Sequence, residues 1–248
     1  MRAGAATVTV RCHGDLNDFL PPEWRGTAIA APLAGHETVK HILESLGVPH
    51  PEIGGLLVNG AGVGFGQIAA PGDQLDAYPA ALAPSHALPL RPPLPAPRFV
   101  ADAHLGRLAA YLRMLGLDTL YRNDYHDAEL ARLAHDELRV LLTRDVGLLK
   151  RGIVTYGAFV RATLPQEQLR EVVRRFALYD ASASFQRCIS CNGPTAPVEK
   201  AAVLHRLEPK TRRYYDTFRQ CLACGKIYWP GSHYARMRAV VQQAVSRS

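Results

Sequence analysis

The sequence lacks any feature that would place it in or across a membrane. No stretch approaches the ~18 uninterrupted apolar residues of a membrane-spanning helix. The first ten residues hold one arginine and too short an apolar core for a secretion signal, so we expect a cytoplasmic protein with no membrane partner. The 48% hydrophobic content is normal for a globular chain, and 248 residues allow two or more small domains.

Cysteine is nearly absent outside one region. Cys12 is the single exception, and the other four form two Cys-x-x-Cys pairs, Cys188 with Cys191 and Cys221 with Cys224. Disulfides are the alternative reading, but the missing secretion signal argues against them. Two such pairs supply the four thiolates of a tetrahedral site. We predict structural Zn²⁺ because protein fills all four positions, although iron also binds four thiolates.

Acidic residues are scarce in the last quarter of the chain. Residues 181–248 hold 3 Asp/Glu against 11 Lys/Arg, a charge of +8 that exceeds the +7 of the whole chain. Such a concentration favours a polyanionic partner, with nucleic acid first, and the alternative is a solvated surface that keeps the protein soluble.

Aromatic and basic residues alternate directly after the second cysteine pair. This pattern suits single-stranded RNA, through stacking and phosphate contact. We expect Ser232 and His233 to be exposed, whereas Tyr228 and Trp229 have the alternative role of packing the core of the small module. The candidate RNA-binding residues are Lys226, Trp229, Ser232, His233, Tyr234 and Arg236.

Three short elements in the middle of the chain each end near an acidic residue. Residues 98–102, 118–124 and 139–145 have strand character, and helical spacing covers 105–115 and 128–135 between them. The order β-α-β-α-β predicts a parallel sheet whose carboxyl ends meet at one edge. Carboxylates gathered there repel one another unless a divalent cation neutralises them. The pattern therefore predicts a Mg²⁺ or Mn²⁺ site for phosphodiester hydrolysis.

The strand-end aspartates are the candidate metal ligands. Asp102 and Asp145 occupy equivalent positions after the first and third strands. Asp124 and Asp127 both follow the second strand and compete for a third ligand position. Helix capping is the structural alternative for each, most directly for Asp127, which precedes a helical pattern.

Two arginines lie beside these carboxylates. Arg107 and Arg144 would hold the scissile phosphate or stabilise charge on the leaving oxygen. The alternative for each is a simple ion pair with the adjacent aspartate. Thr143 would bond a ligand carboxylate or the phosphate, and His104 is a helix-start residue rather than a general base.

The first eighty residues have the pattern of a β-grasp domain, in the order strand, strand, helix, strand, strand. A segment with seven prolines from Pro79 to Pro97 follows, and it predicts a stiff extended linker. We expect a β-grasp domain at 1–80, a linker at 81–97, a parallel-sheet α/β domain at 98–180, and a zinc ribbon with a basic C-terminal helix at 181–248.

Residues 38–78 resemble the ubiquitin-like sulfur carriers, through Glu44-Ser45-Leu46-Gly47-Val48-Pro49-His50, Leu57-Val58-Asn59-Gly60 and Gly72-Asp73-Gln74-Leu75. Those carriers act through an exposed C-terminal Gly-Gly. Here the chain continues through Tyr78-Pro79-Ala80 instead. A docking or stabilising role is therefore predicted for this domain.

Residues 98–238 resemble the Mut7-C RNase family. The motifs are Phe99-Val100-Ala101-Asp102-Ala103-His104-Leu105-Gly106-Arg107-Leu108, Leu112-Arg113-Met114-Leu115-Gly116, Leu142-Thr143-Arg144-Asp145 and the two cysteine pairs with their following residues, Asn192-Gly193 and Gly225-Lys226-Ile227-Tyr228-Trp229 through Gly231-Ser232-His233-Tyr234. The resemblance implies a PIN-like nuclease domain with a zinc ribbon, and some members carry a ubiquitin-like N-terminal domain. It also implies metal-dependent RNA cleavage, with Asp102 and Asp145 as metal-site acids and Asp124 or Asp127 as the third.

Together these patterns predict a metal-dependent ribonuclease whose zinc ribbon assists the binding of single-stranded RNA, tRNA or rRNA. The alternative is a non-catalytic RNA-binding protein, or one associated with the ribosome or tRNA. In either case we expect a protein partner for the β-grasp domain.

Overall fold

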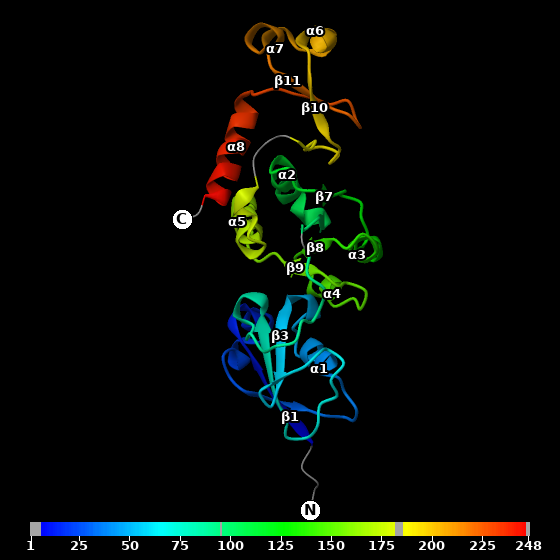
Figure 1. The fold of residues 1–248 in the computed structure, drawn as a ribbon, viewed down its shortest axis with the longest axis vertical. Coiled ribbons are helices and arrows are strands. Elements are labelled where there is room, and N and C mark those ends of the chain that lie inside the picture. The colour runs from blue at the N-terminus through cyan, green and yellow to red at the C-terminus, as the bar shows by residue number, and fades with distance from the viewer. Residues whose placement is uncertain (1–5, 95, 182–185, 247–248) are drawn as a thin grey trace, which may run out of the picture. The chain divides into compact units, whose positions relative to one another are not determined.

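The computed structural model describes residues 6–94, 96–181 and 186–246 (Figure 1). The chain folds into two compact units. The first comprises residues 1–95 together with 145–159, and the second comprises 96–144 together with 160–248. None of the described helices has the length and hydropathy needed to cross a membrane.

The first unit is built on a five-stranded mixed sheet in the order β2-β1-β5-β3-β4, in which β1 and β5 are parallel. Alternate residues of β1 are buried, and the apolar face of α1 packs with them in one core. The side chain of Thr38 begins α1 by accepting from the amide of His41. The predicted β-grasp order is confirmed, with β1 (Thr7–Cys12), β2 (Ile29–Pro32), α1 (Val39–Ser45), β3 (Ile53–Val58), β4 (Ala61–Gly62) and β5 (Gln74–Pro79).

The proline-rich segment after β5 lies against β3. A 3₁₀ turn at Ala80–Leu82 follows β5 directly, and a Cβ added to Gly54 would collide with the backbone of Ala80. Further along, the Arg91 guanidinium donates to backbone carbonyls of residues 50, 51 and 53. The segment predicted as a linker is thus packed onto the first unit as far as residue 94.

A segment from the middle of the chain completes the first unit. Residues 145–159 contain α4 (Val146–Leu149) and β9 (Gly157–Phe159). The rings of Phe19 and Phe159 meet edge to face, with centroids 5.4 Å apart. The hydrogen bonds that join this segment to the residues before it include Lys150 Nζ to Glu44 O (2.7 Å), His50 Nε2 with Val154 O (2.7 Å), Phe159 N to Glu52 Oε1 (2.7 Å) and Tyr156 OH to Pro92 O (2.9 Å).

The second unit contains three parallel strands in the order β7-β6-β8. Their order in the sequence confirms the predicted β-α-β-α-β pattern, although the second strand has two residues where the pattern predicted seven. All residues of β6 and β8 are buried, as expected for a parallel sheet covered by helices. The elements are β6 (Phe99–Ala101), α2 (Gly106–Met114), β7 (Thr119–Leu120), α3 (Asp127–Asp136), β8 (Val140–Thr143) and α5 (Pro165–Arg175).

The cysteine region folds around a three-stranded antiparallel sheet, β10-β11-β12. Two short helices lie between its first two strands in sequence, and Val203, Leu207 and Phe218 form its small core. The last helix, α8, packs against α5 and α2, and the two neighbours α8 and α5 can be followed in Figure 1. The elements are β10 (Thr195–Val198), α6 (Lys200–Val203), α7 (Pro209–Tyr214), β11 (Phe218–Cys221), β12 (Ile227–Tyr228) and α8 (Ser232–Val245).

Candidate metal centre and nucleic-acid interface

The four cysteines of the two Cys-x-x-Cys pairs come together in the second unit. Their Sγ atoms all lie within 4.8 Å of one another. The Sγ atoms of Cys188 and Cys224 are 3.7 Å apart, and those of Cys191 and Cys221 are 3.5 Å apart. A tetrahedral site with Zn–S bonds of about 2.3 Å separates its sulfurs by about 3.8 Å. The cluster therefore has the donors and the spacing that a structural zinc ion requires.

The two cysteine pairs adopt the same turn. Asn192 and Gly225, which follow the second cysteine of each pair, both have a φ of 70°. Glycine tolerates this left-handed conformation without strain, and asparagine adopts it more readily than most residues. The matching bonds are Asn192 N to Cys188 O (2.9 Å), Gly225 N to Cys221 O (3.0 Å), Cys191 N to Cys188 Sγ (3.4 Å) and Cys224 N to Cys221 Sγ (3.4 Å).

The protein environment gives the thiols unequal acidity. Burial, together with the neighbouring sulfurs, raises the pKa of Cys191 to about 12. Burial would raise the pKa of Cys221, but the backbone amides of Cys224 and Ala223 together with the bonds to the Cys191 and Cys224 thiols outweigh it and lower this pKa to about 7. Metal binding requires all four thiols to be deprotonated, so it releases the protons that such groups carry.

Tyr228 supports the cluster from the next strand. Its hydroxyl lies 2.9 Å from Cys188 Sγ and accepts from the amide of Ser190 at 3.4 Å. Burial and the bond to Cys188 raise the pKa of Tyr228, so the hydroxyl stays protonated and can donate to the sulfur. The sequence suggested RNA stacking or core packing for Tyr228, and the hydrogen bond adds a role in orienting a metal ligand.

A buried arginine fastens the first cysteine turn to α2. Arg113 donates to the carbonyls of Ile189 and Ser190, both at 2.9 Å, and to the carbonyl of Thr119 at 2.8 Å. Burial lowers the pKa of Arg113, while the sulfurs of Cys188 and Cys191 partly compensate.

Asp118, just before β7, also attaches the first cysteine turn to the parallel-sheet region. Its carboxylate accepts from Asn192 Nδ2 at 2.7 Å and from Arg139 Nη1 at 2.8 Å, and it lies 3.5 Å from Arg187 Nη2. Burial alone would raise the pKa of Asp118, but the bonds from Arg139 and Asn192 outweigh it and hold the pKa below its ordinary value. The cysteine module is thus joined to the parallel sheet by charged and polar bonds.

Asp102 lies at the carboxyl end of β6 as the sequence predicted. One carboxylate oxygen accepts from the amide of Ala103 at 2.6 Å, and the other accepts from Thr143 Oγ1 at 2.7 Å. Thr143 is the last residue of β8, and β6 and β8 are parallel neighbours paired at Ala101 and Leu142. The structure therefore brings Asp102 and Thr143 together at one edge of the sheet.

The other predicted acids have different surroundings. Asp124 is exposed and pairs with Arg122 at 2.6 Å, and Asp127 is the exposed first residue of α3. Asp145 belongs to the first unit, where its carboxylate caps α4 by accepting from the amides of Gly147 (2.7 Å) and Leu148 (3.2 Å). Within the described ranges, the four cysteines are the one group of three or more metal-ligating side chains that lie this close together.

The predicted arginines also differ from each other. Arg107 is exposed near the start of α2. Arg144 donates from Nη1 to the carbonyls of Val160 (3.1 Å), Arg161 (2.8 Å) and Ala162 (2.5 Å). These bonds anchor the Arg144 side chain to the chain segment that precedes α5.

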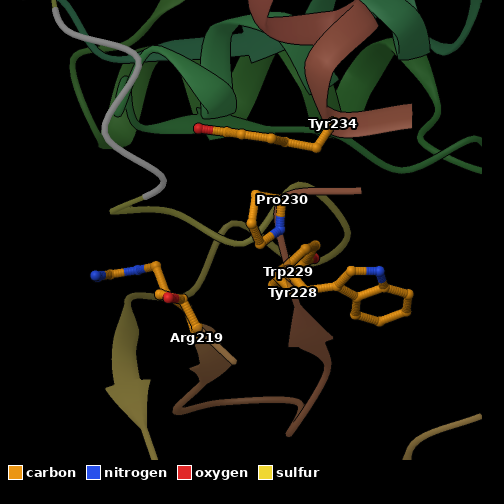
Figure 2. Close-up of a pocket in the computed structure, with 6 residues that line it drawn as sticks. Arg219, Tyr228, Trp229, Pro230 and Tyr234 are labelled. Carbon is orange, nitrogen blue, oxygen red and sulfur yellow. The ribbon is translucent and has the colours of Figure 1, made fainter. Parts of the chain in front are cut away.

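A small pocket lies between the cysteine module and the start of α8. Its volume is about 140 Å³. Figure 2 shows the Tyr234 ring on the opposite side of Pro230 from the side chains of Arg219, Tyr228 and Trp229. The lining residues are Thr217, Arg219, Tyr228, Trp229, Pro230 and Tyr234. The other predicted RNA-binding residues, Lys226, Ser232, His233 and Arg236, are exposed, which confirms the expectation for Ser232 and His233.

Comparison with protein families gives two matches. The model of the Mut7-C RNAse domain matches residues 97–241, more than half of the chain. The chain belongs to the Mut7-C RNAse family. The Mut7-C ubiquitin model matches residues 5–84, so the predicted family and its ubiquitin-like N-terminal domain are confirmed. No curated protein and no solved structure matches the chain.

Three residues of the Mut7-C RNAse region make side-chain contacts across the fold that the sequence patterns did not predict. Asp118, Arg113 and Arg219 each act through partners distant in the chain, so no local motif marks them. For Arg113 one signal existed: it is a charged residue inside an apolar run, between Leu112 and Met114 of α2. A buried arginine at such a position requires several carbonyl or carboxylate partners.

Proposed function

We propose that this member of the Mut7-C RNAse family is a metal-dependent ribonuclease that hydrolyses RNA phosphodiester bonds at the carboxyl edge of the parallel sheet. Structural Zn²⁺ would occupy the cysteine cluster, and the basic module around it would assist RNA binding. One observation carries the proposal. In an RNAse domain, the Asp102 carboxylate is held between the ends of two parallel strands by the Ala103 amide and Thr143.

The hydrogen bonds on Asp102 suit a metal ligand. Each carboxylate oxygen accepts one bond, and each keeps lone-pair capacity for a cation. Bonds of this kind fix the orientation of a ligating carboxylate. Oxygen ligands of this type are those that Mg²⁺ and Mn²⁺ prefer.

Asp102 and Asp145 would hold the catalytic Mg²⁺ or Mn²⁺, with Asp124 or Asp127 as the third ligand. Asp145 follows Thr143, the last residue of β8, by two residues in the chain. When bound, the cation supplies Lewis acidity for the phosphoryl oxygen and an acidified water. Arg107, which is exposed near the start of α2, would contact the phosphate. Arg144 would act mainly by bracing the segment after residue 159.

The decisive experiment measures cleavage of labelled single-stranded RNA and tRNA by zinc-loaded protein, with and without added Mn²⁺ or Mg²⁺. Asp102→Asn and Asp145→Asn should each lower the cleavage rate at least about a hundredfold, because the lost metal interaction contributes several kcal/mol to the transition state. Asp136→Asn, which removes an exposed carboxylate at the end of α3, is the matched control and should leave the rate unchanged. Full activity of the Asp102→Asn protein would refute the site.

A second candidate function is RNA binding without catalysis. It is favoured by the structural bonds of two of the acids, since Asp145 caps α4 and Asp124 pairs with Arg122. Under this alternative the protein binds RNA in a salt-sensitive manner, and the aspartate variants bind as well as the unchanged protein. The absence of cleavage with every metal and RNA tested would favour it.

A further inference from the structure

We propose that the pocket at the start of α8 binds one unpaired nucleobase of an RNA strand. This inference rests on the proposed action on RNA and assigns one recognition subsite within it. The residues that form the subsite are Arg219, Tyr228, Trp229, Pro230 and Tyr234.

The size of the pocket fits a single planar group. Its volume of about 140 Å³ is well below the roughly 300–1,000 Å³ of pockets that enclose whole small ligands. A nucleotide as a unit does not fit in such a space, whereas one base inserted from a strand that stays outside does. The partial exposure of Trp229, at 37%, leaves the pocket open to such a strand.

The lining chemistry is that of a base-stacking site. Three aromatic rings and a proline ring supply flat apolar surfaces, which stack on any of the four bases. Arg219 adds a planar cation, which stacks on rings and bonds to base edges or phosphate. Its guanidinium is held in place by Thr195, with Nε 3.1 Å from Oγ1 and Nη2 2.8 Å from the carbonyl oxygen.

Charge favours RNA over a protein partner as the occupant. The pocket belongs to the segment 181–248, which carries 11 Lys/Arg against 3 Asp/Glu. Arg236 and Arg238 follow Tyr234 on α8 and are exposed. An aromatic side chain of a protein would fill the same space but would pair with these cations only where carboxylates lie beside it, whereas every stacked base of an RNA strand has phosphates beside it that would pair with them.

The cysteine cluster holds one wall of the pocket. The Tyr228 ring lines the pocket while its hydroxyl bonds Cys188 Sγ at 2.9 Å. A ring fixed at both ends loses little freedom when a base stacks on it, which favours binding.

Intrinsic fluorescence can test the subsite, because the chain has two tryptophans, Trp24 and Trp229. In the Trp24→Phe protein all tryptophan emission comes from Trp229. This protein is titrated with a short oligouridylate and with an abasic oligomer of equal length, with no Mg²⁺ or Mn²⁺ added so that the RNA stays intact. We expect the oligouridylate to quench Trp229 and to bind on the order of tenfold more tightly, since a stacked base contributes about 1–3 kcal/mol.

Variants of Tyr234 provide the matched pair. In the same background Tyr234→Ala should abolish the preference for the oligouridylate over the abasic oligomer, and Tyr234→Phe, which keeps the ring, should retain it. Circular dichroism and zinc content establish that both variants are folded. Equal affinity for the two oligomers, an unchanged preference in Tyr234→Ala, or equally tight binding of a tryptophan-containing peptide would overturn the inference.

Different results would refute the nuclease function and the base-binding subsite. Base-dependent quenching in a protein that cleaves no RNA would remove the nuclease function and keep the subsite. Metal-dependent cleavage without base-dependent quenching would remove the subsite and keep the nuclease function.

Discussion

Asp118 connects three parts of the second unit through one carboxylate, since Arg139, Arg187 and Asn192 all contact it. The Arg139 side chain is 5% exposed, so loss of its partner leaves a nearly buried cation with less compensation. We therefore expect Asp118→Asn to lower the free energy of unfolding by about 3 kcal/mol near neutral pH. Urea unfolding at about pH 7 measures this loss.

The same substitution changes the pH dependence of stability. The pKa of Asp118 in the folded protein lies below its ordinary value, so its contribution is complete above the ordinary pKa of about 3.9 and is lost as pH falls through the lowered pKa. The stability difference between the unchanged protein and Asp118→Asn should accordingly shrink as pH falls below about 4. Asp216→Asn, which breaks an exposed ion pair with Lys200, is the control and should cost under about 1 kcal/mol. A difference that stays constant down to acid pH would contradict the assigned role.

Tyr228 offers a test of the metal centre at a single hydroxyl. Tyr228→Phe keeps the ring but removes the bond to Cys188 Sγ, so zinc affinity should fall about 10- to 100-fold. Competition with a chromophoric chelator measures the affinity. Tyr214→Phe changes an exposed tyrosine of the same module and should have no effect. Equal zinc affinity of the Tyr228→Phe protein would show that the hydroxyl does not support the cluster.

At the scale of elements, the segment of α4 and β9 depends on residues that precede it by about a hundred positions. Glu52 is buried and accepts from the amide of Phe159 at the end of β9. Glu52→Ala leaves that amide without this acceptor, at a cost of about 1–3 kcal/mol. Hydrogen exchange should then become faster in peptides covering 145–159 and remain unchanged in β6.

Glu23→Ala, which truncates an exposed glutamate of the first unit, is the control for Glu52→Ala and should leave exchange unchanged. Under the proposed metal site, in which Asp145 is a ligand, the Glu52→Ala protein should also cleave RNA more slowly, because Asp145 begins the segment. Unaltered exchange over 145–159 would mean that Glu52 does not hold the segment.

Local patterns predicted most elements of this fold. The pattern of the first eighty residues predicted the β-grasp order, helical spacing predicted α2 and α3, and strand character predicted β6 and β8. The second strand of the parallel sheet was predicted too long, because residues 121–124 had strand character and an acidic end. In the structure Tyr121 bonds the carbonyl of Ala103 instead, and Arg122 pairs with Asp124 in an exposed turn.

The candidate sites were predictable to different degrees. The cysteine cluster was predictable because both halves of the site are marked by a short fixed spacing. Asp102 was placed correctly at its strand end, and its bond to Thr143 follows from the parallel pairing. The bonds of Asp118 and the support from Tyr228 were not predictable, since they join residues 21 to 74 positions apart and leave no periodic signal.

For the whole molecule, the largest difference from the predicted plan is the composition of the first unit. The sequence predicted a β-grasp domain that ends before a linker. In the structure, the proline-rich segment packs on β3, and residues 145–159 belong to the same compact unit. This arrangement has no sequence signature because it depends on isolated polar pairs such as Glu52 with Phe159. It supports a stabilising role for the ubiquitin-like region, one of the two roles that its missing Gly-Gly suggested.

The divided first unit also constrains how the chain is made. Residues 6–94 leave the ribosome before residues 145–159 do, and at roughly 5–20 residues per second the delay between residue 94 and residue 159 is roughly 3–13 s. During that time the nascent β-grasp sheet exists without the segment that will cover Phe19 and bond to Glu52. Strands β6 to β8 emerge within the same interval. The second unit therefore begins to emerge before the first unit is complete. If translation stops before residue 145, the product is a first unit without its last segment.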